Sequence, residues 1–400
     1  MTHALGWMFI ANLVGVWLAL LLLFPPLGKI MGEWTYGRWV PVHLNVHLYG
    51  WTSLPLVGAL FYVYQVKGEY ARSIVWLWSL ALAIGSLSWL MGESGGKVFL
   101  DWRGVSSYLF IAVMSALWIV IAMAWWKGRG KMQLLGLLAL LPVPVMLYLA
   151  TRPDIYPPVD PGTGGPTGAS LLGSTLSVIF LLLILPKMCG CQKQKSSTLW
   201  TRVGWTAFAL QCLLMLVIKT GNSSHREVQQ ILALGSLLFW IPVMPAYMGQ
   251  WSWREGVRGW RIATLSWLAL LILTGWVSFL PGWLDHLKFT NGLVAHSHLA
   301  MAGFVTSFLM LLMGQILPEE STRHLVEKRA FRLWQGALIL YVSLMWYSGW
   351  REGNEVGFVI NHGGEIQRIY ALRFICGLLI LWSSWQWFSS SVSHHSTSKI

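Results

Sequence analysis

Long apolar stretches separated by short polar connections form the pattern of this chain. A stretch of about 20 apolar residues is long enough to cross the hydrocarbon core of a bilayer as a helix, and about twelve such stretches are present. No connection between them is long enough to hold a separate soluble domain. The pattern therefore predicts an all-α, polytopic membrane protein with a single transmembrane domain over residues 1–400. The helices are expected to centre near residues 16, 54, 81, 117, 141, 177, 209, 237, 271, 304, 341 and 381.

Composition agrees with this class. Hydrophobic residues make up 56% of the 400 residues and charged residues only 11%, and the mean hydropathy is +0.58. A soluble globular domain carries about 25% charged residues. The first apolar stretch ends in Phe24-Pro25-Pro26 and lacks the short core and small-residue cleavage site of a signal peptide. We expect it to remain in the mature chain.

The formal charge of +13 would suit a nucleic-acid-binding protein, but its distribution indicates topology instead. The even-numbered connections hold most of the basic residues, such as Lys67 and Lys127, and the odd-numbered ones hold most of the acids, such as Asp101 and Glu352. Because positive residues favour the cytoplasmic side, the even connections and both termini are predicted to lie in the cytoplasm. The chain is thus expected in the cytoplasmic (inner) membrane, with lipid and not nucleic acid around it.

Tryptophan and cysteine change this picture little. Many of the 27 tryptophans, including Trp51 and Trp126, were expected near segment ends as interface anchors. Cys189 and Cys191 form a Cys-Gly-Cys in a cytoplasmic connection, where reduced, chemically inert thiols are the simpler interpretation and metal or redox chemistry the alternative. The sequence contains no Cys-x-x-Cys-His, so no covalently attached haem is expected.

Histidines inside the predicted spans are the main candidates for chemistry. The second span contains His43 and His47, and the tenth contains His296 and His298. Both spans are predicted to run from outside to inside, and the histidines follow soon after each start, so all four are expected at a similar depth. Neutral histidine in a bilayer is rare and usually functional. The remaining histidines lie in tails, connections or at a helix start, and four of them are expected to be solvated: His3, His324, His394 and His395.

Helix geometry separates the roles of these four side chains. At about 100° per residue, His296 and His298 project about 200° apart, so they can serve two cofactors on opposite sides of one helix. His43 and His47 are four residues apart and share a face, so one of them could bind iron together with His298. Hydrogen bonding to a neighbouring helix would explain any single histidine equally well. For His47, ligation, hydrogen bonding and simple packing all stay open.

Several motifs around these histidines resemble subunit I of the haem–copper oxidases, particularly the C-type oxidases and their nitric oxide reductase relatives. The resemblance is specific in the second span and from about residue 285 to the end. It is carried by His43-Leu-Asn45 followed by Gly50, Gly58, Phe61-Tyr62-Val63 and Gln65, by Phe289-Thr290-Asn291 followed by His296-Ser297-His298 and Gly303, by LYVSLMWYSGW (340–350), and by Tyr370-Ala-Leu-Arg373 followed by Gly377.

The resemblance implies a subunit I-like helical bundle that binds haem. His43 and His298 would be the axial ligands of a low-spin haem b, and His296 would bind a second, high-spin haem. Arg373 would lie near haem propionates, although an interface arginine at a helix start is an equal alternative. Partners implied are other subunits of a membrane redox complex and a c-type cytochrome that donates electrons on the outer side.

The chain departs from the family where copper would bind. The family holds copper with histidines of the sixth and seventh spans, but GASLLGSTLSVIFLLLILPK and RVGWTAFALQCLLMLVIK contain none, and His225 alone does not make a copper site. We therefore expect a haem-b-binding electron carrier without a working oxygen-reducing site. The alternatives are an active cytochrome c oxidase or nitric oxide reductase with an atypical second metal, which leaves enzymatic activity open, and a twelve-helix transporter or assembly scaffold.

Overall fold

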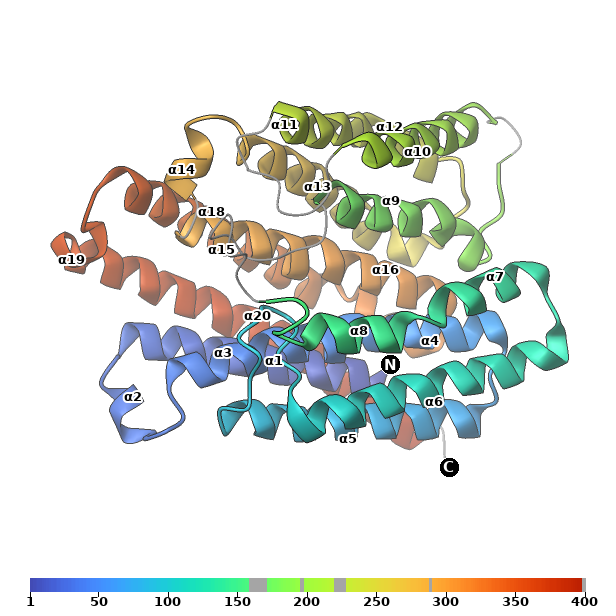
Figure 1. The fold of residues 1–400 in the computed structure, drawn as a ribbon, viewed down its shortest axis with the longest axis horizontal. Coiled ribbons are helices and arrows are strands. Elements are labelled where there is room, and N and C mark those ends of the chain that lie inside the picture. The colour runs from blue at the N-terminus through green and yellow to red at the C-terminus, as the bar shows by residue number, and fades with distance from the viewer. Residues whose placement is uncertain (158–170, 195–197, 219–227, 288–289, 398–400) are drawn as a thin grey trace. The chain divides into compact units, whose positions relative to one another are not determined.

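The computed structural model describes residues 1–157, 171–194, 198–218, 228–287 and 290–397. These residues form helices joined by turns, and the one β-type pairing within them is an isolated antiparallel bridge between Lys193 and Trp251 (Figure 1). The prediction of an all-α protein is therefore confirmed for the part of the chain that the structure describes.

Ten helices in the described ranges are long and apolar enough to cross a membrane. Several are composed of consecutive segments, because prolines and local changes of helix type interrupt them. In chain order they are α1 (Thr2–Leu23); α3 (Tyr36–Asn45) with η1 (Val46–Thr52) and α4 (Ser53–Tyr64); α5 (Gly68–Leu90); α6 (Gly104–Gly128); α7 (Lys131–Leu140) with α8 (Val143–Thr151); α10 (Leu199–Val217); α11 (Val228–Gly235) with η2 (Ser236–Phe239) and α12 (Trp240–Met248); η3 (Glu255–Val257) with α13 (Arg258–Val277); α15 (Asn291–His298) with η4 (Leu299–Val305) and α16 (Thr306–Ile316); and the Gly363–Ser393 part of α20 (Gly363–Thr397).

Two further helices lie where the other two spans were predicted. The apolar helix α9 is described over Leu171–Met188, and α18 (Lys328–Asn354) carries charged residues at both of its ends. The described structure thus supports a polytopic bundle with ten candidate spans, and the count of twelve remains a prediction. Short connecting helices complete the chain: α2 (Leu27–Ile30), α14 (Trp283–Leu287), α17 (Glu319–Thr322), η5 (Arg323–Val326) and α19 (Phe358–Asn361).

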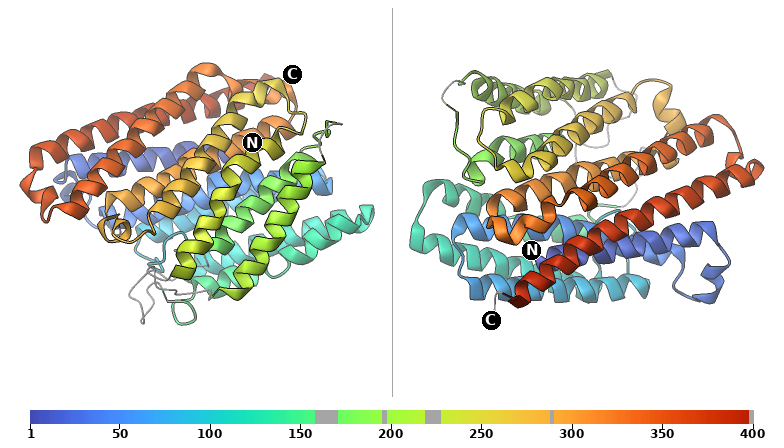
Figure 2. Two further views of the ribbon diagram at one scale, coloured as in Figure 1. Left: turned by 90° about the horizontal axis from the view of Figure 1, so that it is seen from above. Right: turned by 180° about the vertical axis from the view of Figure 1, so that it is seen from behind.

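The helices group into two compact units, Met1–Val159 with Ile380–Ile400, and Asp160–Leu379. In the first unit α1 packs against α3 and η1, and α5 packs against α6. In the second unit α13 packs against η4 and α16, and α15 packs against α18. The view from behind shows α20 as one continuous long helix (Figure 2).

The Asn291–Ile316 helix is the most enclosed of the ten candidate spans, with 72% of its apolar window buried. Within it, every residue from Thr306 to Gln315 is buried. A helix that is apolar on all sides is expected to be surrounded by other helices instead of facing lipid. The segment that carries His296 and His298 is therefore continuous with a helix fixed in the protein interior.

The tryptophans divide between the core and the surface. Trp51 is fully buried in the middle of the second span, so its prediction as an interface anchor is wrong. Trp102 is also buried, and its ring stacks on Phe110 with a centroid distance of 4.2 Å. Trp126, in contrast, is 64% exposed at the end of α6, as expected of an anchor. Large aromatic side chains thus fill the space between helices as well as marking their ends.

The connection between α5 and α6, residues 91–103, folds back against the second span. Asp101 is only 3% exposed, and its Oδ2 accepts a hydrogen bond of 2.7 Å from Nδ2 of the buried Asn45. Its Oδ1 accepts from Oγ of Ser94 at 2.5 Å, and its backbone carbonyl accepts from Nε1 of Trp89 at 3.0 Å. Burial raises the pKa of the Asp101 carboxyl, and these hydrogen bonds oppose that rise. The carboxyl fixes the connection to the helices.

Lys97 in the same connection predicts a dependence of stability on pH. It is 7% exposed, with Nζ 2.9 Å from the centre of the Tyr156 ring, and burial lowers its pKa from 10.5 to about 8. Between these two values the unfolded chain holds the lysine proton and the folded protein has released it. The free energy of unfolding is therefore expected to rise as the pH increases through this window, relative to Lys97→Met, by at most about 3 kcal/mol.

Denaturant titrations of both proteins at pH values across the window would measure this difference. The exposed Lys131 provides the control, because Lys131→Met removes a lysine that is not buried. A wild-type curve parallel to that of Lys97→Met from neutral pH to the end of the window would contradict the prediction.

Candidate functional site

His43 lies near the end of α3 and is held by α1. Its Nδ1 donates a hydrogen bond of 2.9 Å to the backbone carbonyl of Ala11. Because a carbonyl can only accept, the ring proton is on Nδ1, and Nε2 carries the lone pair of the neutral ring. This is the arrangement in which a histidine can bind a metal through Nε2 while its other nitrogen is anchored.

His47 lies within η1, next to His43. The two rings meet edge to face, with centroids 5.0 Å apart and planes at 84°. The predicted sharing of one helix face by these two residues is therefore seen in the structure. The contact places His47 against the ring of His43, so it contributes to fixing the orientation of that ring.

His296 is held by α13 in a similar way. Thr274 donates its hydroxyl proton to the carbonyl of Leu270 at 2.7 Å, and its oxygen therefore accepts from Nδ1 of His296 at 3.1 Å. Nε2 of His296 again carries the lone pair. The hydroxyl takes the role at His296 that a backbone carbonyl takes at His43.

His298 makes its contacts on a different side of the helix. Its Nδ1 donates to the carbonyl of Val294, one turn earlier in the same helix, at 2.8 Å. Its ring lies 4.8 Å from the ring of Tyr341 in α18, measured between centroids. His296 therefore faces α13 and His298 faces α18, as the 200° separation predicted.

A glycine of the neighbouring helix makes room for each anchored ring. A Cβ added to Gly15 of α1 would lie 2.8 Å from Cε1 of His43. A Cβ added to Gly275 of α13 would lie 3.3 Å from Cε1 of His296. Side chains at these positions would push the imidazoles out of their present places.

A second glycine, seven residues after each histidine, packs against a tryptophan of the same neighbouring helix. A Cβ at Gly50 would lie 2.6 Å from Cβ of Trp7, and a Cβ at Gly303 would lie 2.7 Å from Cδ2 of Trp267. In α1, Trp7 precedes Gly15 by eight residues. In α13, Trp267 precedes Gly275 by the same number. The same pairing of two helices around a histidine is thus built twice, once in each unit.

Both histidine-bearing spans also change helix type close to their histidines. The two π-helical segments among the described residues are η1, Val46–Thr52, and η4, Leu299–Val305. The first begins three residues after His43, and the second begins one residue after His298. Because π-helical turns are energetically poorer than α-helical ones, they are found often at functional sites.

Arg373 joins the surroundings of His298. Its side chain is buried, with the residue 6% exposed, and Nη2 donates to the hydroxyl of Tyr341 at 3.4 Å. Nη1 donates to Oδ1 of Asn291 at 3.2 Å. The guanidinium therefore contacts both the ring that lies beside His298 and the first residue of the helix that carries it.

The start of that helix is fixed by a carboxylate of α18. Oε1 of Glu352 accepts from Nδ2 of Asn291 at 2.5 Å and from Oγ of Ser348 at 2.7 Å. Its Oε2 accepts from the backbone nitrogen of Asn291 at 2.9 Å. An anion at a helix N-terminus satisfies unpaired N–H groups and interacts favourably with the helix dipole. Arg373, Asn291 and Glu352 thus form one connected polar cluster.

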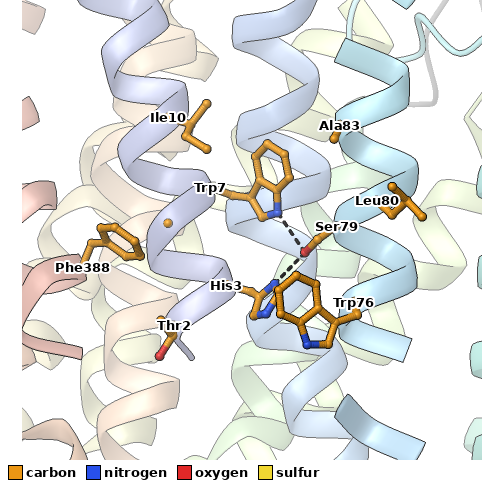
Figure 3. A pocket seen from close by; sticks show the side chains of 10 residues that line it. Thr2, His3, Trp7, Ile10, Trp76, Ser79, Leu80, Ala83 and Phe388 are labelled. Carbon is orange, nitrogen blue, oxygen red and sulfur yellow. Dashed lines mark hydrogen bonds between the residues drawn. The ribbon is translucent and has the colours of Figure 1, made fainter. Parts of the chain in front are cut away.

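Of the histidines expected to be solvated, His3 is half-buried and His324 is buried. His3 shares a hydrogen bond of 2.8 Å with Oγ of Ser79, and its ring meets Trp76 edge to face at 4.5 Å (Figure 3). These residues line a cavity of about 450 Å³, which the indole of Trp7 also lines. His324 is only 8% exposed. The structure describes neither the side chains of His394 and His395 nor any part of His225.

The cysteines show the properties of structural thiols. Cys189 and Cys191 are buried, and no disulfide links the described cysteines. Burial raises the pKa of Cys189 strongly and that of Cys191 to about 11, which keeps both protonated and weakly nucleophilic. Within the described ranges no three histidine, cysteine or carboxylate side chains gather as a ligand set for a metal ion.

Some components of the site were not anticipated. The anchoring groups on Ala11 and Thr274 belong to the preceding spans, α1 and α13, and Tyr341 lies in a matched motif to which the resemblance gives no role. The repeated spacing of histidine and glycine, seven residues in both spans, is a signal in the sequence that could have paired His43 with His296.

The same chain was compared with known proteins at the level of sequence. Neither a protein-family model nor a curated protein matches it.

Proposed function

We propose that this chain binds haem b in the membrane and carries electrons as a subunit of a redox complex, similar to a subunit I of the haem–copper oxidases that lacks the copper ligands. The observation that carries the proposal is the state of His43, His296 and His298. Each lies within a candidate membrane span, and each donates its Nδ1 proton to an oxygen atom. Nε2 is thereby left as the basic atom for iron.

The residues present fit such a group. Haem iron is bound by neutral imidazole in many proteins, and anchoring of Nδ1 sets both the tautomer and the ring orientation. The glycines opposite His43 and His296 leave the rings room to adopt that orientation. Haem b, when bound, supplies reversible one-electron transfer at its iron.

The ligand assignment follows the resemblance: His43 and His298 would hold one haem b, and His296 would hold a second. Arg373 would pair with a haem carboxylate, since a buried guanidinium forms strong charge-assisted hydrogen bonds. Asn291 and Glu352 act through position, because they hold the start of the helix that carries both histidines.

The surroundings of the chain are proposed on the same basis. Twelve membrane-spanning helices in the cytoplasmic membrane, with both termini in the cytoplasm, would leave the histidine-bearing ends of the second and tenth spans toward the outer side. A c-type cytochrome or another haem subunit would deliver electrons there. No copper is assigned, because the sixth and seventh predicted spans contain no histidine.

The optical spectrum of the purified protein tests the proposal. We expect one or two haems per chain by pyridine haemochrome. The haem b held by His43 and His298 gives a dithionite-reduced minus oxidised spectrum that carbon monoxide leaves unchanged, and a second haem held by His296 alone binds carbon monoxide. A CO-reactive haem together with stoichiometric copper or non-haem iron would instead favour an active oxidase or nitric oxide reductase. A folded protein purified without haem would contradict the proposal, and a transporter or scaffold would then lead.

A further inference from the structure

A cavity of about 350 Å³ lies at the ends of α4, α5, α6 and α7, entirely within the first unit. It is formed by the connection that follows α4, residues 65–67, by the last turns of α6, and by Gln133 near the start of α7. These connections are the second and fourth of the chain. Both are predicted to be cytoplasmic, so the cavity is expected at the inner surface of the membrane.

Specific hydrogen bonds shape the walls of this cavity. Gln65 ends α4 in the left-handed conformation, with φ of 55°. Gln133 donates from Nε2 to the carbonyl of Val63 at 2.7 Å, and the buried Tyr64 donates its hydroxyl proton to the carbonyl of Gln133 at 2.6 Å. The end of α4 is thereby tied to α7, which gives the cavity a defined shape.

Two ammonium groups line the cavity without an acidic partner. Lys67 and Lys127 both border it, and no aspartate or glutamate does. Within the described ranges neither lysine side chain forms a hydrogen bond or an ion pair. Arg129, nearby in sequence, is engaged elsewhere, with its guanidinium 5.0 Å from the centre of the Trp126 ring. The cavity therefore presents uncompensated positive charge.

The part of the lining that α6 contributes before Lys127 is apolar. Val120, Met123 and Ala124 line the cavity there, and Met123 is 49% exposed. A ligand that fits both the lysines and this apolar part needs an anionic group beside the lysines and hydrocarbon along α6. Basic pockets of this kind between helices on the cytoplasmic side of membrane proteins are suited to anionic lipid head groups.

We propose that this cavity binds the phosphate of an anionic phospholipid. Lys67 and Lys127 contact the phosphate, and the acyl chains lie along α6. The site is separate from the histidines and does not depend on haem being bound. The shared chemistry is recognition of a phosphate anion, so inorganic phosphate is the alternative source that an experiment has to distinguish.

Native mass spectrometry of the full-length protein in a mild detergent tests the site. Phosphatidylglycerol is titrated into the wild type and into the double variant Lys67→Ala with Lys127→Ala, and the lipid-bound fraction is counted. A charge near the membrane surface contributes about 1 kcal/mol per lysine, so the double variant is expected to bind about 30-fold more weakly. Lys131 is the first residue of α7 and does not line the cavity, so Lys131→Ala is expected to bind phosphatidylglycerol as the wild type does.

Two comparisons separate lipid from free phosphate. Phosphatidylcholine, whose phosphate is balanced by choline, is expected to bind weakly to all variants. Excess inorganic phosphate is expected to leave phosphatidylglycerol bound, because the apolar part of the lining holds only the lipid. Displacement by inorganic phosphate would assign a free-anion site and overturn the lipid proposal. Equal phosphatidylglycerol binding by the wild type and the double variant would remove the cavity as the site altogether.

Discussion

Alanine in place of His43 is expected to lower the content of CO-inert haem b at least about tenfold, because changes to groups that merely orient a metal ligand already cost about 10–100-fold in metal affinity. Nδ1 of His43 is anchored to a neighbouring helix, at the backbone carbonyl of Ala11. Removing this side chain takes away Nε2, the atom proposed to bind iron. Pyridine haemochrome quantitation per milligram of purified protein measures the loss.

His47 supplies the matched control for this variant. It lies four residues later, is also partly buried, and touches His43 edge to face at 5.0 Å. If it only fixes the neighbouring ring, His47→Ala retains most of the haem with at most a shifted spectrum. Equal retention of haem by His43→Ala and the wild type would contradict the ligand assignment. Loss in His47→Ala alone would transfer the role to that residue.

The lengths of the apolar stretches predicted most of the fold, because the bilayer imposes a simple length requirement on each membrane-spanning helix. The candidate spans lie where the apolar runs were centred. α18 shows where this signal weakens. Its uncharged centre contains Gln335 together with tryptophan, tyrosine, serine and glycine residues, which lower its hydropathy below that of the ten candidate spans.

The pattern of hydrophobic and polar residues along the sequence could not show which polar side chains of the connections are buried in the fold. Asp101 was used only as a marker of the outer side, yet its carboxyl is buried against Asn45. Lys97 likewise lies on the ring of Tyr156, 59 residues further along the chain. Such contacts arise from the packing of distant segments, which the period of a single helix does not encode.

The histidines illustrate the same limit at the candidate site. Spacing predicted that His296 and His298 face different ways, since two residues correspond to about 200° on any helix. It could not predict that Thr274 anchors one of them and that the ring of Tyr341 lies beside the other. Nor could it predict η1 and η4, because a π-helical segment depends on how neighbouring helices accommodate an inserted residue.

A close approach of the backbones of α18 and α15 predicts the second large effect, at Gly349 of α18. A Cβ at this position would overlap the backbone nitrogen of Gly292 and lie 2.6 Å from its Cα. Backbone atoms cannot move aside as a flexible side chain can, so Gly349→Ala has to separate α18 from α15. Overpacking without relief is expected to cost about 3 kcal/mol or more. For a chain of 400 residues, that cost corresponds to a midpoint of thermal unfolding about 4 °C lower.

Gly336 of the same helix makes this prediction specific. It is exposed, and a Cβ there would meet nothing within 4 Å. Gly336→Ala is therefore expected to leave the midpoint unchanged or to raise it slightly, since alanine favours the helix over glycine by about 0.5–1 kcal/mol. Thermal unfolding of both variants in one detergent compares them directly. Equal midpoints for the two variants would mean that α15 and α18 do not approach closely at Gly349. The helix that carries His296 and His298 would then be held mainly by Glu352 and Arg373.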